Sequence, residues 1–214
     1  MSVVTIRGQL GSGAQEIAKI VAGKIGGDYV DRHIIAQVAL RLNRESAEVR
    51  AKEQPPGTLL GRITEALTRS SPFDAGLGIE GAYLPSWELP VDDESYVRAL
   101  KAVITALAQS PNIVIYGRGS QFILKDHPRA FHVLVVAPLD IRIKRVMVDI
   151  GADERAARSE INRIDGSSRT YIKRYFGGDL EDPMHYDIVV NTRRLSFEMA
   201  ADIVGAGLDS RKAP

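Results

Sequence analysis

The chain has 214 residues, a length that suits one domain with insertions better than two full domains. Its 28 Lys and Arg residues nearly balance 27 Asp and Glu residues, so the net charge of +1 provides no global basic field for nucleic acid. The absence of cysteine excludes disulfides and thiolate metal ligands, and no apolar run approaches the roughly 20 residues of a membrane span. We therefore expect a cytoplasmic protein that has neither nucleic acid nor a membrane as a partner.

A glycine-rich turn separates the first predicted strand, residues 3–6, from an amphipathic helix that begins near Gln15. Glycines allow the backbone to aim several N–H groups at one anion, and the positive end of the following helix adds its field. The turn matches Gly8 and Gly13 of the pattern G-x-x-x-x-G-K-[ST], but it has Ala14 in place of the lysine and Gln15 in place of the hydroxyl residue. An ordinary turn, in which glycine merely permits a positive φ angle, is the alternative. We predict a phosphate site formed by Gly8, Gly11, Ser12, Gly13, Ala14 and Gln15.

A carboxylate follows the second predicted strand, residues 28–30. Asp31 lies at the carboxyl end of this strand, which is the side of an open α/β sheet where ligands bind. Asp31 is therefore a candidate ligand contact, and capping of the next helix is the alternative.

Residues 53–93 interrupt the regular pattern with clusters of Gly, Pro and Ser. Because this stretch is too long for a plain connection, we interpret it as an inserted segment that faces the substrate. Its Tyr83 and Trp87 could stack on a base, but they could equally anchor the segment to the core or to another subunit, which leaves a homodimer open.

An arginine follows the third predicted strand, residues 112–116. Gly117 and Gly119 flank Arg118 and leave the backbone free to bring its guanidinium into the crevice, where the fork geometry suits a phosphate. We favour this role over that of a solvated surface arginine, because the strand aims Arg118 at the same side as the glycine loop.

A long basic helical region is predicted between Asp153 and Phe176, with an apolar stripe on one side and several arginines on the other. One interpretation is a solvated face with intrahelical ion pairs such as Asp165 with Arg169, each worth only about 0.2–0.5 kcal/mol. The other is a lid that folds arginines over transferring phosphates. The number of arginines does not choose between these interpretations.

Strands and helices alternate along the chain. Further strands are predicted at residues 131–137 and 186–192, and further helices near residues 93–109, 140–150 and 195–204. This alternation predicts right-handed crossovers and a parallel sheet that helices cover on both faces.

These motifs, in this order, resemble the cytidylate kinase-like family, a branch of the P-loop nucleoside monophosphate kinases. The similarity spans residues 3–204 and is weakest in residues 53–93. It rests on residues 8–15, 29–32, 117–119, 133–138, 140–145, 171–177 and 186–192.

The resemblance implies a single P-loop NTPase-like domain over residues 1–214, with three α/β/α layers and a parallel five-stranded sheet. Residues 53–93 would be the inserted monophosphate-binding segment, and residues 151–178 would be a helical lid. The glycine loop would cradle the phosphates of ATP, and Mg²⁺ would be bound through those phosphates and water without a protein ligand. The resemblance also implies catalytic roles for Arg118, Arg163, Arg169 and Asp31, and substrate contacts for Asp31, Arg32, Arg118, Asp165 and Arg169.

The chain departs from the cytidylate kinases at Ala14 and Gln15, and at Gly119, where those enzymes carry an aspartate. The missing lysine would meet developing charge, so another cation must replace it or turnover is slow. We expect ATP-dependent phosphoryl transfer to a nucleoside monophosphate, CMP or dCMP. The alternatives are a non-catalytic nucleotide-binding regulator and a scaffold that has lost nucleotide binding. The candidates for the replacement cation are Arg7, Lys19, Arg163, Arg169 and Arg174.

Overall fold

The computed structural model describes residues 2–31 and 94–212. The chain divides into two compact units. The first unit comprises Met1–Tyr29 together with Asn112–Pro214, and the second comprises Val30–Pro111. The predicted inserted segment at residues 53–93, with Tyr83 and Trp87, and the candidate Arg32 lie outside the described residues.

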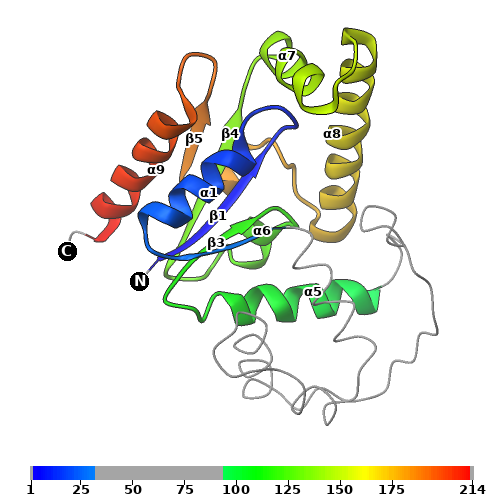
Figure 1. The fold of residues 1–214 in the computed structure, drawn as a ribbon. Coiled ribbons are helices and arrows are strands. Elements are labelled where there is room, and N and C mark those ends of the chain that lie inside the picture. Colours follow the sequence, from blue (N-terminus) through cyan, green and yellow to red (C-terminus); the bar gives the residue numbers. More distant parts are fainter. Residues whose placement is uncertain (1, 32–93, 213–214) are drawn as a thin grey trace, which may run out of the picture. The chain divides into compact units, whose positions relative to one another are not determined.

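A five-stranded sheet in the order β2-β3-β1-β4-β5 organises the fold (Figure 1). Strand β1 pairs in parallel with β3 and β4, and β4 pairs in parallel with β5. This arrangement confirms the parallel α/β sheet that the alternation of elements predicts. The strands are β1 (Ser2–Gly8), β2 (Asp28–Val30), β3 (Asn112–Tyr116), β4 (Ala130–Val136) and β5 (Ile188–Asn191).

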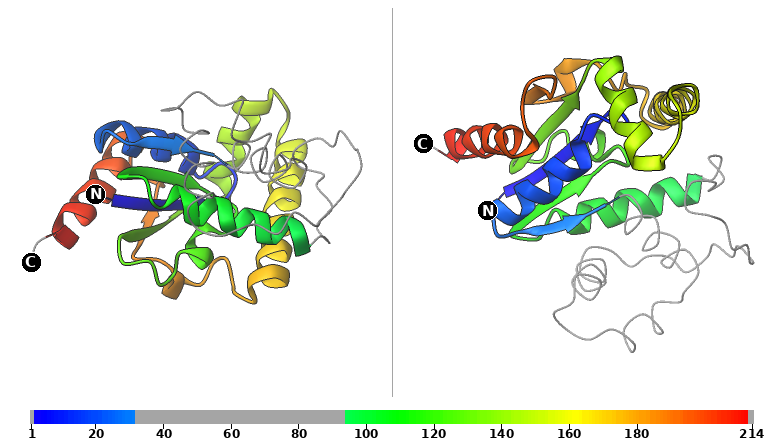
Figure 2. Two further views of the ribbon diagram at one scale, coloured as in Figure 1. Left: turned by 90° about the horizontal axis from the view of Figure 1, so that it is seen from below. Right: turned by 45° about the horizontal axis from the view of Figure 1, so that its top comes forward.

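The helices α1 (Ala14–Lys24) and α9 (Phe197–Lys212) pack against one another on one face of this sheet (Figures 1 and 2). Side chains alternate between the two faces of a strand, so every second residue of β1 and β4 joins this core. Burial of this apolar face is the main force that fixes the helices on the sheet. The strand residues in the core include Val4, Ile6, Val133 and Val135, and the helix residues include Ile17, Val21, Ala201 and Val204.

A second apolar cluster joins α7 (Leu139–Ile150) to α8 (Glu154–Phe176). Helix α8 begins where the Asp153 carboxylate accepts a hydrogen bond of 2.8 Å from the Ala156 amide, and it ends at Gly177, which has a φ of 67°. These caps confirm the predicted helix between Asp153 and Phe176. The cluster comprises Ile143, Val146, Ala157 and Ile161, with Leu10 and Met147 packed against it.

Three shorter or separate elements complete the description. Helix α6 (Ser120–Ile123) follows β3, and a 3₁₀ turn (Pro183–His185) precedes β5. In the second unit, α5 (Glu94–Leu107) agrees with the predicted helix near residues 93–109 and buries Leu100, Val103, Ile104 and Leu107.

The loop that follows β1 lies at the point where the strand order reverses. From β1 the chain continues to β2 and β3 on one side of the sheet and then to β4 and β5 on the other. In open α/β sheets, ligands bind outside the carboxyl ends of the strands at this switch point.

Candidate functional site

The loop between β1 and α1 is shaped by glycines in the left-handed region. Gly11 has a φ of 78° and Gly13 a φ of 84°, values that other residues adopt only with strain. A side chain at Gly11 would also lie 2.7 Å from the carbonyl oxygen of Arg142. Gly13 serves as the left-handed cap and α1 begins at Ala14, which agrees with the predicted start near Gln15.

The carbonyl groups of three consecutive loop residues are held from outside the loop by side chains of α7 and the segment after β5. Such contacts turn the carbonyl oxygens toward the protein, so the N–H groups of the same peptides face the other way. Arg142 Nη1 donates to Leu10 O at 3.2 Å, Arg145 Nη1 donates to Gly11 O at 3.2 Å, and Thr192 Oγ1 donates to Ser12 O at 2.8 Å.

Four amide groups of the loop and the first turn of α1 have no hydrogen-bond acceptor among residues 2–31 and 94–212. By contrast, the Ser12 amide donates to Gln9 O at 3.0 Å and the Leu10 amide to Asp165 Oδ1 at 3.0 Å. Converging N–H groups at a helix N-terminus form an anion-binding concavity. The four donors are the amides of Gly11, Gly13, Ala14 and Gln15.

A buried hydroxyl lies inside the same turn. Ser12 is fully buried, and its Oγ has no hydrogen-bond partner in the described part of the chain. The Oγ would lie 2.5 Å from a Cβ built on Gly8, so it occupies the space that the glycine leaves open. A buried hydroxyl without a partner is costly, and its place inside the glycine turn makes the Ser12 hydroxyl a candidate donor to a bound anion.

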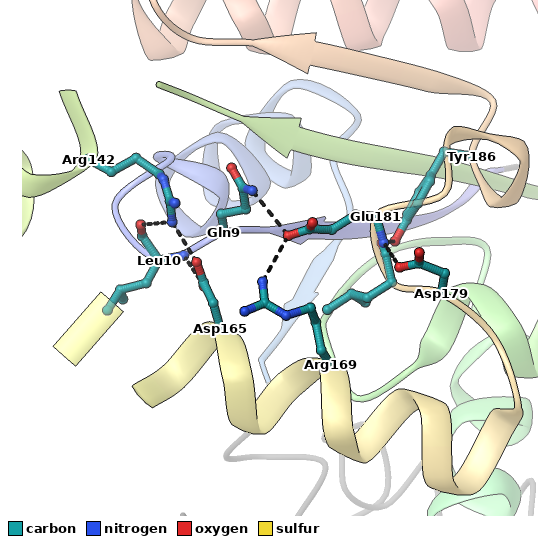
Figure 3. Close-up of polar contacts among 9 residues, drawn as sticks. Gln9, Leu10, Arg142, Asp165, Arg169, Asp179, Glu181 and Tyr186 are labelled. Atoms are coloured by element: carbon teal, nitrogen blue, oxygen red, sulfur yellow. Dashed lines mark hydrogen bonds and ion pairs between the residues drawn. The ribbon is translucent and has the colours of Figure 1, made fainter. Parts of the chain in front are cut away.

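A buried ion pair connects the loop to α7 and α8 (Figure 3). Arg142 Nη1 lies 2.6 Å from Asp165 Oδ2, and the two side chains are only 9% and 7% exposed. The other carboxylate oxygen of Asp165 accepts the hydrogen bond from the Leu10 amide. Asp165 therefore contacts the loop itself, and it pairs with Arg142 and not with Arg169, the partner considered under the solvated-face interpretation.

A second polar cluster beside the loop involves Glu181 (Figure 3). Glu181 Oε1 accepts from Gln9 Nε2 at 3.2 Å and from Arg169 Nη1 at 3.4 Å. A small pocket opens here, with Arg7, Gly8, Gln9, Leu134, Asp165, Leu180 and Glu181 in its lining.

A half-buried tyrosine holds Leu180, one of the residues that line this pocket. Tyr186 donates from its hydroxyl to Leu180 O at 2.6 Å and accepts from Gln121 Nε2 at 3.1 Å. Burial raises the pKa of Tyr186 to about 12, so the phenol stays neutral and holds the pocket wall by hydrogen bonds.

The arginine after β3 has an unusual backbone conformation. Gly117, Arg118 and Gly119 have φ angles of 80°, 58° and 71°, and Arg118 is the only non-glycine residue with a positive φ among those described. Strain of this kind concentrates at functional sites. A side chain at Gly119 would lie 2.6 Å from the Phe176 ring, so the packing of α8 requires glycine at this position.

Arg163 and Asp31 are the remaining predicted site residues in the described part of the chain. Arg163 makes a two-pronged contact with Glu160, at 2.8 and 2.6 Å, on an exposed part of α8. Residues 165 and 169 share one face of α8, whereas residue 163 lies two positions before 165 and therefore on the opposite face. Asp31 follows β2 at the start of the second unit and is half-buried.

The structure thus brings the glycine loop, Asp165 and Arg169 together. No role is predicted from the sequence for the residues that hold the loop carbonyls or for Glu181. The spacing of Arg142 and Arg145, three residues apart on the helix after β4, is a sequence signal for these two residues, whereas Thr192 and Glu181 have none. These overlooked residues are Arg142, Arg145, Thr192 and Glu181.

Within residues 2–31 and 94–212, no three His, Cys, Asp or Glu side chains are grouped so that they could hold a metal ion. None of the helices in this part of the chain is both long and apolar enough to cross a membrane.

Comparisons with known proteins agree with this architecture. The family model described as the cytidylate kinase-like family matches residues 3–194. A cytidylate kinase of Staphylothermus marinus is 30% identical over 128 residues, which cover 60% of this chain and 67% of that protein. A cytidylate kinase of Sulfolobus acidocaldarius is 26% identical over 210 residues, covering 98% of this chain and 94% of that protein. The crystal structure of an uncharacterised protein from Eubacterium ventriosum has the same fold, with a TM-score of 0.70 at 19% identity over 98% of this chain and 99% of that one.

Proposed function

Because the chain belongs to the cytidylate kinase-like family, we propose that it transfers the terminal phosphoryl group of ATP to a nucleoside monophosphate, CMP or dCMP. An oxygen of the acceptor phosphate attacks the γ-phosphorus in line, and the bond to the bridging oxygen breaks. That electron pair leaves with ADP, and the acceptor becomes CDP or dCDP. The relatives named cytidylate kinase support this acceptor.

The observation that carries this proposal is the anion cradle of the glycine loop. Its free amides and the buried Ser12 hydroxyl offer donors in a turn whose carbonyl oxygens are held away from it. This arrangement fits the phosphates of ATP. Mg²⁺ would supply neutralisation of phosphate charge and would be bound by the nucleotide phosphates and water.

Arg169 is the strongest candidate for the cation that replaces the loop lysine. Glu181 links it to Gln9 of the loop, and Arg7 lines the same pocket. The other candidates are engaged elsewhere: Arg163 with Glu160, Lys19 over the Tyr29 ring and Arg174 over the Tyr175 ring.

On the acceptor side, we propose that Arg118 binds the monophosphate, together with Asp31 and Arg32. The strained φ of 58° at Arg118 supports a functional role for this residue. We retain Asp165 as a residue of the site, in contact with the loop. A reaction between free nucleotides is expected in the cytoplasm and requires neither nucleic acid nor a membrane.

A non-catalytic nucleotide-binding regulator is the second candidate. Ala14 supplies no charge to the loop, and Arg142 and Arg145 are both engaged with loop carbonyls. Such a protein would bind nucleotide in the same cradle without transferring the phosphoryl group.

A panel of thermal shifts and coupled assays distinguishes these functions. Wild-type protein with ATP and Mg²⁺ is tested against CMP, dCMP, UMP and AMP, and Arg118→Ala is tested beside it. The proposal predicts ADP release with CMP or dCMP, and loss of this activity in the variant at an unchanged melting temperature. A melting-temperature increase with ATP but no ADP release would favour the regulator. No shift with any nucleotide would contradict both functions.

A further inference from the structure

One buried ion pair holds both the backbone N–H and the backbone C=O of a single loop residue, Leu10. Asp165 Oδ1 accepts from the Leu10 amide at 3.0 Å, and Arg142 Nη1 donates to the Leu10 carbonyl at 3.2 Å (Figure 3). The two side chains bind each other at 2.6 Å. We propose that Arg142 and Asp165 are positioning residues that set the phosphate-binding geometry of the loop, an inference that rests on the proposed function.

Stability alone does not explain the ion pair. Removing two charges from water is costly, and apolar residues of similar size often stabilise a protein as well or better. An apolar pair, however, can neither accept a hydrogen bond from the Leu10 N–H nor donate one to the Leu10 C=O. The specific contribution of Arg142 and Asp165 is therefore the orientation of Leu10.

The packing around Leu10 supports this role. Its side chain packs against the apolar cluster between α7 and α8, so α7 and α8 hold both its backbone and its side chain. The next residue, Gly11, approaches the α7 backbone so closely that a Cβ would lie 2.7 Å from Arg142 O. With the Leu10 amide directed at α8 and the Ser12 amide bonded to Gln9 O, the amides of Gly11, Gly13, Ala14 and Gln15 are left for an anion.

The ion pair also fixes the position of Arg169 relative to the loop. Asp165 and Arg169 are separated by four residues of α8, about 6 Å along the helix axis, on the same face. Anchoring Asp165 to Leu10 therefore places Arg169 beside Gln9, where Glu181 contacts both side chains. Both carboxylate oxygens of Asp165 are used in this anchor, so Asp165 acts through the loop and does not itself bind the substrate.

The test replaces the ion pair by apolar residues of similar size, Arg142→Met with Asp165→Leu. Melting temperature, hydrogen exchange of the Leu10 amide and calorimetric ATP affinity are measured for the full chain. We expect a melting temperature close to that of the wild type, at least about tenfold faster Leu10 exchange and about tenfold weaker ATP binding, which corresponds to about 1.4 kcal/mol. Asp165→Asn, which keeps an acceptor for the amide, should retain most of the exchange protection and serves if the double variant does not fold.

Thr5→Val is the matched control, because it removes a buried side-chain hydrogen bond away from the loop, between Thr5 Oγ1 of β1 and His132 Nδ1 of β4 at 2.7 Å. It should lower the melting temperature without changing Leu10 exchange or ATP affinity. Unchanged Leu10 exchange in the double variant would overturn the proposal, as would faster exchange with unchanged ATP affinity. If wild-type protein binds no ATP, the proposed function fails, and the exchange measurement still decides whether the ion pair holds Leu10.

Discussion

Replacing Ser12 by alanine should change folding stability and nucleotide affinity in opposite directions. The Ser12 hydroxyl is fully buried, and no described group hydrogen-bonds to it. An unsatisfied buried polar group costs roughly 1–3 kcal/mol. Ser12→Ala removes this cost but also loses a few packing contacts of the hydroxyl. The net effect should be a free energy of unfolding of the ligand-free protein that is higher by about 1 kcal/mol, or a melting temperature higher by about 2–4 °C for a chain of this size.

With ATP bound, the same hydroxyl should donate to a phosphate oxygen. A hydrogen bond to a charged group contributes about 1.5–3 kcal/mol, so Ser12→Ala should raise the dissociation constant of ATP about tenfold to a hundredfold. Thermal unfolding without ligand and calorimetric titration with ATP measure the two effects.

Ser120→Ala provides the control, because Ser120 Oγ is also buried without a partner in the described part of the chain but lies in α6. It should stabilise the protein to a similar extent and leave ATP affinity unchanged. A lower melting temperature for Ser12→Ala, or an ATP affinity equal to that of the wild type, would refute the assignment of Ser12 to the anion cradle.

Three further changes test other parts of the structure. Glu181→Gln removes a carboxylate that competes with phosphate for Arg169. The exposed Arg169–Glu181 pair is worth less than about 1 kcal/mol, so titration should show ATP affinity increased by at most about fivefold. A lower ATP affinity would contradict this competition. Gly119→Asp should lower the melting temperature by at least about 5 °C, because a side chain at this positive φ is strained and would also overlap the Phe176 ring. A melting temperature equal to that of the wild type would contradict the need for glycine here. Burial lowers the pKa of His132 in the folded protein below its ordinary value of 6.5. Between the folded-state pKa and 6.5, the unfolded chain therefore binds more protons than the folded protein. Folding stability should fall as the pH drops through 6.5 toward the folded-state pKa. Melting curves between about pH 8 and pH 5.5 should show a weaker fall for His132→Gln than for the wild type, and equal slopes would be inconsistent with the lowered pKa.

The parallel sheet and the glycine loop could be predicted because their signals are local. Apolar runs bounded by glycine and proline mark β3 and β4, and the strand, turn and helix order marks the loop after β1. The helix predicted to begin near Gln15 begins at Ala14, after a left-handed cap at Gly13. The same local reasoning correctly placed α8 between Asp153 and Phe176.

The contacts that give the site its geometry could not be predicted in this way. Asp165 and Leu10 are 155 residues apart in the sequence, and Arg142 and Leu10 are 132 apart. Periodicity assigns charged residues to the solvent side of a helix, so it does not identify a buried ion pair. One of the two interpretations left open for this helix included an Asp165–Arg169 pair, whereas the structure pairs Asp165 with Arg142 and Arg169 with Glu181. Only the tertiary structure shows that the positive charges around the loop hold its carbonyl groups.

Transfer of label from γ-phosphate-labelled ATP to CMP is the most direct test of the central claim. Purified full-length protein is incubated with labelled ATP, Mg²⁺ and CMP or dCMP, and the products are separated by chromatography. Labelled CDP or dCDP that forms with the wild type and is strongly reduced with Arg169→Ala is the predicted result. If ATP binds to the wild type but all label stays in ATP or appears as inorganic phosphate, the protein is not a kinase of CMP or dCMP and the central claim is contradicted.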